Sequence, residues 1–170
     1  MDLLILALLG VLPALAIVGG LNDLVTMKIP NWISGLVVLG FFPAAIAVGL
    51  PPLGLAAHLG VGLVALLVGA GMFALRWIGG GDAKLLAAAC LWFGPAGTGA
   101  FLLWTAIFGG LFCLALVLAR NWLRAYPFQG PGWAVRLLAP KGDIPYGVAI
   151  AAGALMAWPQ SPLMLRFMGG

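Results

Sequence analysis

The chain has 170 residues, of which 64% are hydrophobic and 7% charged, and its formal net charge is +4. Soluble domains carry roughly 25% charged residues, so this composition excludes a water-soluble globule and indicates a membrane protein. The basic residues are scattered along the chain rather than gathered on one face, which argues against nucleic-acid binding and favours anionic lipid headgroups as their partners.

Six apolar segments are predicted to cross the membrane, which gives an all-α polytopic fold. In chain order they are residues 3–20, 32–50, 53–77, 83–93, 98–119 and 146–158. Proline and glycine clusters separate them, as is typical of breaks between helices. The first segment carries Asp2 and no preceding basic residue, so we interpret it as a retained helix and not a signal peptide. We expect residues 1–170 to form a single integral-membrane domain.

The basic residues also predict the orientation of the chain. If the segments cross alternately, all basic residues except Arg166 fall on the side of the first connection. These residues are Lys28, Arg76, Lys84, Arg120, Arg124, Arg136 and Lys141. By the positive-inside rule this side is cytoplasmic and the N-terminus is outside.

Two stretches depart from a simple spanning pattern. The fourth segment, 83–93, would be only about 17 Å long against a hydrocarbon core of about 30 Å, so we expect its start to lie recessed below the cytoplasmic surface. Residues 120–142 mix aromatic and basic side chains, which is typical of a segment in the headgroup layer. We therefore predict an interfacial cytoplasmic segment there.

Asp23 and Asp82 carry the strongest functional signal. The chain has only four acidic residues, and these two stand at the ends of long apolar stretches on the same predicted side. An ionisable group near hydrocarbon costs about 3 kcal/mol on insertion scales, so such residues are functional by default. Two carboxyl groups that converge are the minimal set for acid–base hydrolysis of a peptide bond.

Simpler interpretations of both residues remain open. Asp82 could cap a helix that begins at Ala83, although a cap does not explain the three preceding glycines, which favour a close approach of another backbone. Asp23 could be a solvated loop residue. Asp143 is a rival for the second carboxylate, because it also precedes an apolar segment on the cytoplasmic side.

Other chemistries lack the residues that they need. Cys90 and Cys113 have no CxxC spacing, and His58 is the one histidine of the sequence, so we expect no metal site and no cofactor. We expect packing roles for the two cysteines and an interfacial or packing role for His58. His58 also has no charged neighbour in the sequence, which argues against a Ser–His–Asp set. The Asp-Thr-Gly motif of pepsin-like enzymes does not occur.

Three ordered motifs resemble those of the type IV prepilin peptidases, in particular their short TadV/CpaA-like form. In chain order they are Asp23 with Ile29-Pro30-Asn31, then Gly79-x-Gly81-Asp82 with Ala83-Lys84, and Ile144-Pro145-Tyr146-Gly147. The resemblance implies an aspartic endopeptidase of the bacterial inner membrane that removes the short basic leader from type IV or Flp-like prepilins or pseudopilins at the cytoplasmic face. Its partners would be the pilin precursor, membrane lipid and the pilus-assembly machinery.

The resemblance also assigns roles to individual residues. Asp23 and Asp82 would be the catalytic pair of a two-aspartate acid–base mechanism. Residues that support the site or bind substrate would be Gly79, Gly81, Lys84, Pro30, Asn31, Pro145, Tyr146 and Gly147.

Two other classes of protein could place aspartates in this way. Signal-peptide peptidases and presenilin-like enzymes pair a Tyr-Asp motif with a later GxGD, and the residue before Asp23 is Asn22, which disfavours them. A non-catalytic subunit or transporter could use the aspartates as a proton relay. The CxxC insertion of the longer, N-methylating prepilin peptidases does not occur in this sequence, so we expect a peptidase without methyltransferase activity.

Overall fold

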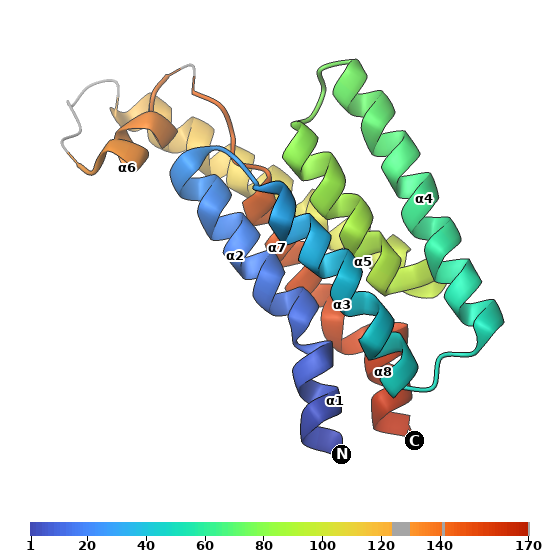
Figure 1. Ribbon diagram of the computed structural model, residues 1–170. Helices are drawn as coiled ribbons and strands as arrows, with labels where there is room; N and C mark the ends of the chain where they lie inside the picture. The colour runs from blue at the N-terminus through green and yellow to red at the C-terminus, as the bar shows by residue number, and fades with distance from the viewer. Residues whose placement is uncertain (124–129, 141, 170) are drawn as a thin grey trace.

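The computed structural model describes residues 1–123, 130–140 and 142–169, and across them the chain is helical with no strand. Both termini lie at one end of the bundle, and α6 and the α4–α5 connection lie at the other, which we call the α6 end (Figure 1). The elements are α1 (Asp2–Leu9), α2 (Val11–Thr26), α3 (Asn31–Ala47), α4 (Pro52–Ala74), α5 (Gly80–Leu123), α6 (Gly132–Leu137), α7 (Gly147–Ala157), the 3₁₀ helix η1 (Trp158–Gln160) and α8 (Pro162–Gly169).

The first apolar helix is longer than predicted, because α2 continues to Thr26. It ends where Met27 takes a left-handed conformation, with φ 57°. The side chains of Asn22 and Thr26 hold this turn, since both donate hydrogen bonds to the Lys28 carbonyl, at 2.7 and 3.2 Å. Asp23 therefore lies inside the last turns of a helix, and the interpretation of Asp23 as a solvated loop residue is wrong.

Helix α5 contains two predicted segments in one continuous element. It bends at Gly94, where φ is 56°, and Pro95 follows. The second limb runs back behind the bundle towards the α6 end (Figure 1). A Cβ atom at Gly94 would run into the His58 ring, so the bend depends on glycine. The first limb starts at Gly80, which places Asp82 in its first turn, and the interpretation of Asp82 as the residue that caps a helix beginning at Ala83 is wrong.

The last predicted segment also extends beyond its expected end. The Trp158-Pro159 break forms only the short η1 turn, and α8 follows it directly. Residues Gly147–Gly169 thus make one candidate span of 23 residues. Proline is tolerated here because it occupies the first turn of a new short helix, where its missing N–H has no intrahelical partner to lose.

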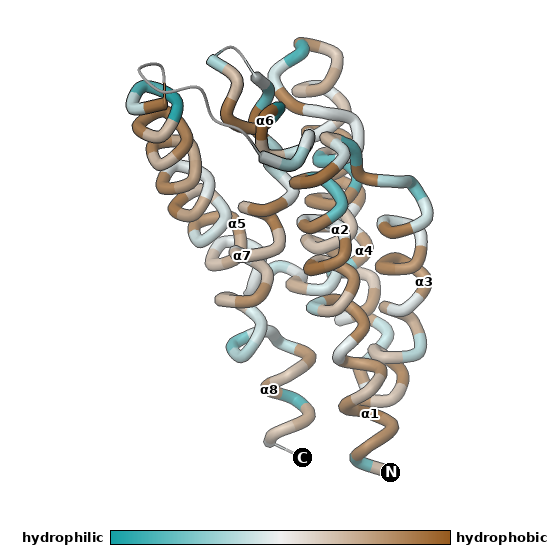
Figure 2. The backbone as a smooth tube through the Cα atoms, turned by 90° about the vertical axis from the view of Figure 1, so that its left-hand side faces the viewer, coloured by the Kyte–Doolittle hydropathy of each residue, from teal (hydrophilic) through white to brown (hydrophobic). Residues whose placement is uncertain are grey.

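Length and composition are those of a polytopic membrane protein. Among the described residues, four helical stretches are long and apolar enough to cross a membrane: Asp2–Thr26, Pro52–Ala74, Gly80–Leu123 and Gly147–Gly169. The apolar helix α3 is shorter. Many large apolar side chains face outwards, which is unfavourable in water and expected in lipid. Figure 2 shows that most hydrophilic parts of the tube gather at the α6 end.

Helix α5 packs against α3, α4 and α7, and the end of its first limb is well buried. Its Trp92 is fully buried, and the indole N–H donates to the Val37 carbonyl at 2.8 Å. His58 is buried, stacks on Phe41, and has Nδ1 2.8 Å from the Leu91 carbonyl oxygen, which confirms its packing role. These contacts anchor the end of the limb opposite Asp82.

Candidate active site

The three sequence motifs meet at the α6 end of the bundle. Asp23 of α2, Asp82 of α5 and Tyr146 at the start of α7 border one cavity of about 670 Å³. We call it the polar pocket. Its lining residues are Asp23, Met27, Phe73, Arg76, Trp77, Ile78, Gly79, Asp82, Asp143, Ile144, Pro145 and Tyr146. The two predicted carboxylates therefore share a cavity, although they are 59 positions apart in the sequence.

Asp23 is fixed by the start of α7. Its side chain is only 5% exposed, and Oδ2 accepts a 2.8 Å hydrogen bond from the backbone N–H of Gly147. A Cβ atom at position 147 would lie 3.0 Å from Asp23 Oδ2 and 2.9 Å from Ile29 Cδ1. Glycine is thus required at position 147 because a helix backbone must come this close to the carboxylate.

Asp82 is partly buried, and its Oδ1 is a buried atom without a hydrogen-bond partner among the described residues. The preceding glycines shape its surroundings in two ways. A Cβ atom at Gly79 would lie 2.7 Å from Asp82 Oδ2, and one at Gly81 would lie 2.9 Å from Ile29 Cβ and 3.1 Å from the Ile29 carbonyl oxygen. The expected close backbone approach therefore exists, and the chain's own Ile29 makes it at Gly81.

The groups of the polar pocket act on one another electrostatically. Asp82 interacts with Asp23 and with the Tyr146 hydroxyl. Burial, and then the charge of Asp82, raise the pKa of Tyr146 above its usual value of 10. The hydroxyl therefore stays protonated at neutral pH and can donate a hydrogen bond inside the pocket.

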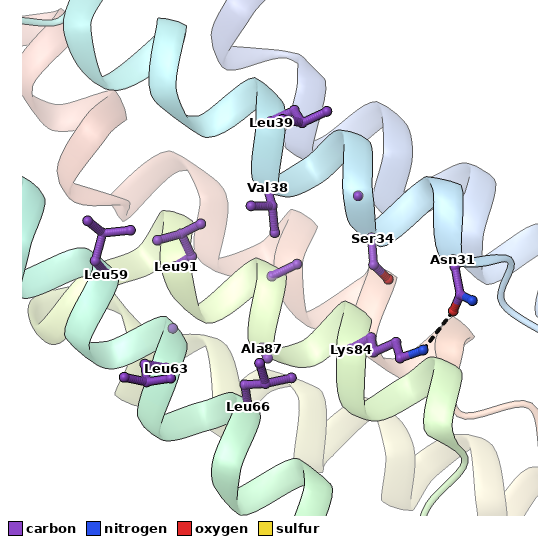
Figure 3. Close-up of a pocket in the computed structure, with 13 residues that line it drawn as sticks. Asn31, Ser34, Val38, Leu39, Leu59, Leu63, Leu66, Lys84, Ala87 and Leu91 are labelled. Atoms are coloured by element: carbon purple, nitrogen blue, oxygen red, sulfur yellow. Dashed lines mark hydrogen bonds between the residues drawn. The ribbon is translucent and has the colours of Figure 1, made fainter.

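Two predicted supporting residues lie elsewhere. Lys84 Nζ donates to Asn31 Oδ1 at 2.9 Å, and both residues border a different cavity between α3, α4 and α5 (Figure 3). Neither is among the residues that line the polar pocket. Pro30, which directly precedes α3, places Asn31 at the first position of that helix.

Arg120 is a residue of the site region for which the sequence predicted only a cytoplasmic position and a place in the interfacial segment 120–142. It is buried near the end of α5, and its guanidinium donates from Nε and Nη2 to the Leu137 carbonyl at 3.0 and 2.8 Å. Nη2 also donates to the Asp143 backbone carbonyl at 2.9 Å. Arg120 therefore joins α5, α6 and the segment that brings Asp143 to the polar pocket. The sequence feature that could have indicated this role is that Arg120 is a single arginine at the end of a long apolar stretch.

The predicted interfacial segment 120–142 is only partly described. Its first residues continue α5, and Gly132–Leu137 form the short helix α6. Positions 124–129 and 141, which include Arg124 and Lys141, lie outside the described residues, so the interfacial location expected for them stays a prediction.

A second cavity of about 670 Å³ adjoins the polar pocket between α4 and the two limbs of α5. We call it the apolar pocket. It shares Ile78, Asp82 and Tyr146 with the polar pocket, whereas most of its other lining side chains are aliphatic, among them Val61, Val64, Val68, Leu86 and Leu102. Asp82 thus stands where a polar and an apolar compartment meet.

The described residues contain no group of three or more His, Cys, Asp or Glu side chains that could hold a metal ion. The polar side chains that border the polar pocket are three carboxyl groups, the Tyr146 phenol, the Arg76 guanidinium and the Trp77 indole, and a backbone amide donates to Asp23. Such groups can donate and accept protons, so the arrangement is suited to acid–base chemistry by carboxyl groups.

Comparisons with known proteins identify the family. No curated protein and no solved structure matches the chain. A family model described as the type IV leader peptidase family matches residues 10–114, which is more than half of the chain. The matched region contains Asp23, Asp82 and the Ile29-Pro30-Asn31 segment between them. The chain therefore belongs to the type IV leader peptidase family, the aspartic peptidases that remove the leader peptide from prepilins.

Proposed function

We propose that Asp23 and Asp82 are the catalytic dyad and that they remove the short basic leader of a type IV or Flp-like prepilin at the cytoplasmic face. The observation that carries this proposal is that both carboxyl groups border one pocket. An enzyme is favoured over a proton-relay subunit because the chain belongs to a peptidase family.

In the proposed reaction one of the two carboxyl groups acts as the general base and the other as the general acid. Two neighbouring carboxyl groups do not both ionise easily, so they share a proton. The Gly147 N–H stabilises negative charge on Asp23, which favours Asp23 as the base that takes a proton from the attacking water. Asp82, whose Oδ1 has no partner among the described residues, carries the shared proton, polarises the scissile carbonyl and then protonates the leaving amine.

The two adjoining pockets suit the two halves of a prepilin. Three carboxyl groups and one arginine, Arg76, border the polar pocket. With the shared proton on Asp82, the carboxylates of Asp23 and Asp143 still outnumber Arg76, so the charge of the pocket complements a basic leader. The apolar pocket complements the apolar stem that follows the leader. Because the pockets meet at Asp82, a substrate that fills both would present its scissile bond there.

The same reasoning supports an orientation in the bacterial inner membrane. We propose six crossings, with α5 contributing two, and an outside N-terminus. In support, both termini lie at the end opposite the polar pocket (Figure 1). Arg76 lies in the α4–α5 connection, Arg120 in the last turn of α5 and Arg136 in α6, all at the α6 end. The polar pocket then faces the cytoplasm, within a single domain made of residues 1–170.

The supporting residues fall into two groups in this proposal. Gly79, Gly81 and Gly147 permit the close approaches that shape the site, and Pro145 and Tyr146 form a wall of the polar pocket. Pro30, Asn31 and Lys84 act through the α3–α5 contact and do not touch the substrate.

The test is co-expression with a candidate Flp-like prepilin, with leader removal followed by mass spectrometry. We expect Asp23→Asn and Asp82→Asn each to lower cleavage by at least 100-fold, since an amide cannot exchange the proton. Asp143→Asn is the matched control because it removes a third carboxylate of the same pocket, and it should retain cleavage. Cleavage that survives Asp23→Asn but not Asp143→Asn would move the second catalytic role to Asp143.

A further inference from the structure

A third cavity lies on the other side of the first α5 limb and borders neither of the proposed catalytic carboxyl groups. It measures about 770 Å³ and runs between α3, α4 and α5 (Figure 3). We call it the α3–α4 groove. Its lining is polar at the end near Asn31 and Lys84 and aliphatic along the rest.

The polar end of the groove offers hydrogen-bond donors. Lys84 Nζ uses one N–H on Asn31 Oδ1, which leaves the amide NH₂ of Asn31 as a donor. Ser34 borders the groove, is only 7% exposed, and its hydroxyl has no hydrogen-bond partner among the described residues. The lining, all of it described, contains no carboxylate. A cation, an amide and an unpaired buried hydroxyl together suit a phosphate group.

The remainder of the groove suits a hydrocarbon chain. Its walls carry Val38, Leu39, Leu59, Leu63, Leu66 and Leu91. Leu91 lies seven residues after Lys84 on α5, which is about 10 Å along a helix. The groove therefore has a cationic end and continues between apolar helices. This order matches a phospholipid, in which an acyl chain extends from a charged headgroup. An apolar groove inside a bilayer has no water to fill it.

The groove is separate from the polar pocket. Asp82 and Lys84 are two positions apart on α5, so their side chains leave the helix on different faces. The polar pocket and the groove have no lining residue in common. A molecule in the groove would therefore not meet the proposed catalytic carboxyl groups.

We propose that the α3–α4 groove binds an anionic phospholipid, whose phosphate lies on Lys84, Asn31 and Ser34 and one of whose acyl chains lies along the leucines. This inference does not rest on the proposed catalytic mechanism. The bound lipid would complete the hydrogen bonds of Ser34 and join the starts of α3 and α5, the two elements that flank the contact between Ile29 and Gly81.

The test reconstitutes the full chain in vesicles of equal parts phosphatidylglycerol and phosphatidylcholine and measures the lipids that remain bound after detergent extraction. We expect wild type to retain phosphatidylglycerol about five-fold over phosphatidylcholine, the preference that one lysine gives for lipid with a net negative charge. Both lipids carry the phosphate, but phosphatidylcholine adds a choline cation, and the groove lining has Lys84 and no carboxylate to pair with it. Lys84→Gln should lose the preference and Lys84→Arg should keep it. Lys28→Gln, at an exposed lysine outside the groove lining, should keep it too.

Two further variants test the groove itself. Gly35→Trp should block it, because Gly35 borders the groove and a side chain there has open space. Gly71→Trp is the matched control, since it also faces open space but borders none of the three cavities. Ser34→Ala should reduce the rise in Tm that phosphatidylglycerol gives to wild type, without lowering Tm in phosphatidylcholine alone.

Three results would overturn the proposal. Wild type could retain both lipids equally, Lys28→Gln could lower retention as much as Lys84→Gln, or a Gly35→Trp protein with wild-type Tm in phosphatidylcholine could retain as much phosphatidylglycerol as Gly71→Trp. The second result would mean that positive charge near the membrane surface, and not the groove, attracts the lipid.

Discussion

At the scale of single residues, the site depends on where glycines let backbone and carboxylate meet. Gly147 and Gly81 both contact Ile29, and Gly147 also contacts Asp23. One isoleucine of the α2–α3 connection therefore packs against the starts of both α5 and α7. The position of each proposed catalytic side chain is set by a contact with a segment far away in the sequence.

Gly147→Ala is expected to impair the proposed dyad. The added methyl would lie 3.0 Å from Asp23 Oδ2, so the helix start must shift and the 2.8 Å hydrogen bond must lengthen. Loss of a hydrogen bond to a charged group corresponds to about 1.5–3 kcal/mol, so kcat/KM should fall about 10- to 100-fold. Gly110→Ala, at a helix position with open space, is the control and should cleave like wild type. Equal activity of both variants would contradict the role of Gly147.

The environment of Tyr146 predicts a pH effect on stability. Its pKa is raised above 10, so the folded state holds the phenol proton more tightly than the unfolded state does. The stability that this gives is fully present below pH 10 and is lost as the pH rises through the folded-state pKa. Between pH 9 and pH 11, the Tm of the Tyr146→Phe variant should therefore fall less than the Tm of wild type. Parallel curves for the two proteins would show that Tyr146 does not titrate differently on folding.

At the scale of elements, α5 organises the molecule. Its bend at Gly94 lets one helix supply both the central limb that carries Asp82 and a second limb that returns to the α6 end (Figure 1). At that end Arg120 closes the arrangement through its hydrogen bonds to Leu137 and Asp143. Both ends of α5 thus contribute to the polar pocket. The start supplies the carboxyl group of Asp82, and Arg120 near the end holds the segment that carries Asp143.

Arg120→Leu is expected to loosen the wall of the polar pocket. The change leaves the carbonyl groups of Leu137 and Asp143 without their donor, so the segment before α7 should exchange its backbone hydrogens faster. We expect KM for prepilin to rise about tenfold with a smaller change in kcat, because the proposed catalytic carboxyl groups keep their own contacts. Arg120→Lys should restore part of the loss. Arg136→Leu removes an exposed arginine of α6 and is the control for charge.

At the scale of the whole molecule, the distribution of polar residues defines two different ends. The α6 end carries the polar pocket, and the opposite end carries both termini and Arg166 near the end of α8 (Figure 1). Such asymmetry is what the positive-inside rule requires of a protein with cytoplasmic chemistry. The proposed orientation follows from the whole bundle and not from one loop.

Cysteine labelling tests that orientation. In a background with Cys90→Ala and Cys113→Ala, we expect Arg136→Cys to react with an impermeant maleimide only after the membrane is opened. Arg166→Cys should react in intact spheroplasts, because α8 lies at the opposite end. The reverse pattern would place the polar pocket outside and would remove the basis for cytoplasmic cleavage.

The sequence by itself determined the class of fold, the order of the apolar segments and the residues worth following. In a bilayer each spanning helix satisfies its own backbone, so hydropathy and helix-breaking residues along the chain predict the elements. The predicted ends of the helices were less accurate. Helix α2 continues past Asp23, α5 starts at Gly80, and the last span continues beyond Trp158. Those ends depend on side-chain contacts such as Asn22 with Lys28, which no local pattern shows.

Only the tertiary structure decided which residues meet. Asp23 receives its hydrogen bond from Gly147, 124 positions away, and Lys84 lies with Asn31 on another face of α5 than Asp82. Arg120 lies near the site only because α5 bends at Gly94 and its second limb runs back to the α6 end. The physical reason is that such contacts come from the packing of whole helices against one another, whereas the sequence patterns report only which parts of the chain prefer lipid.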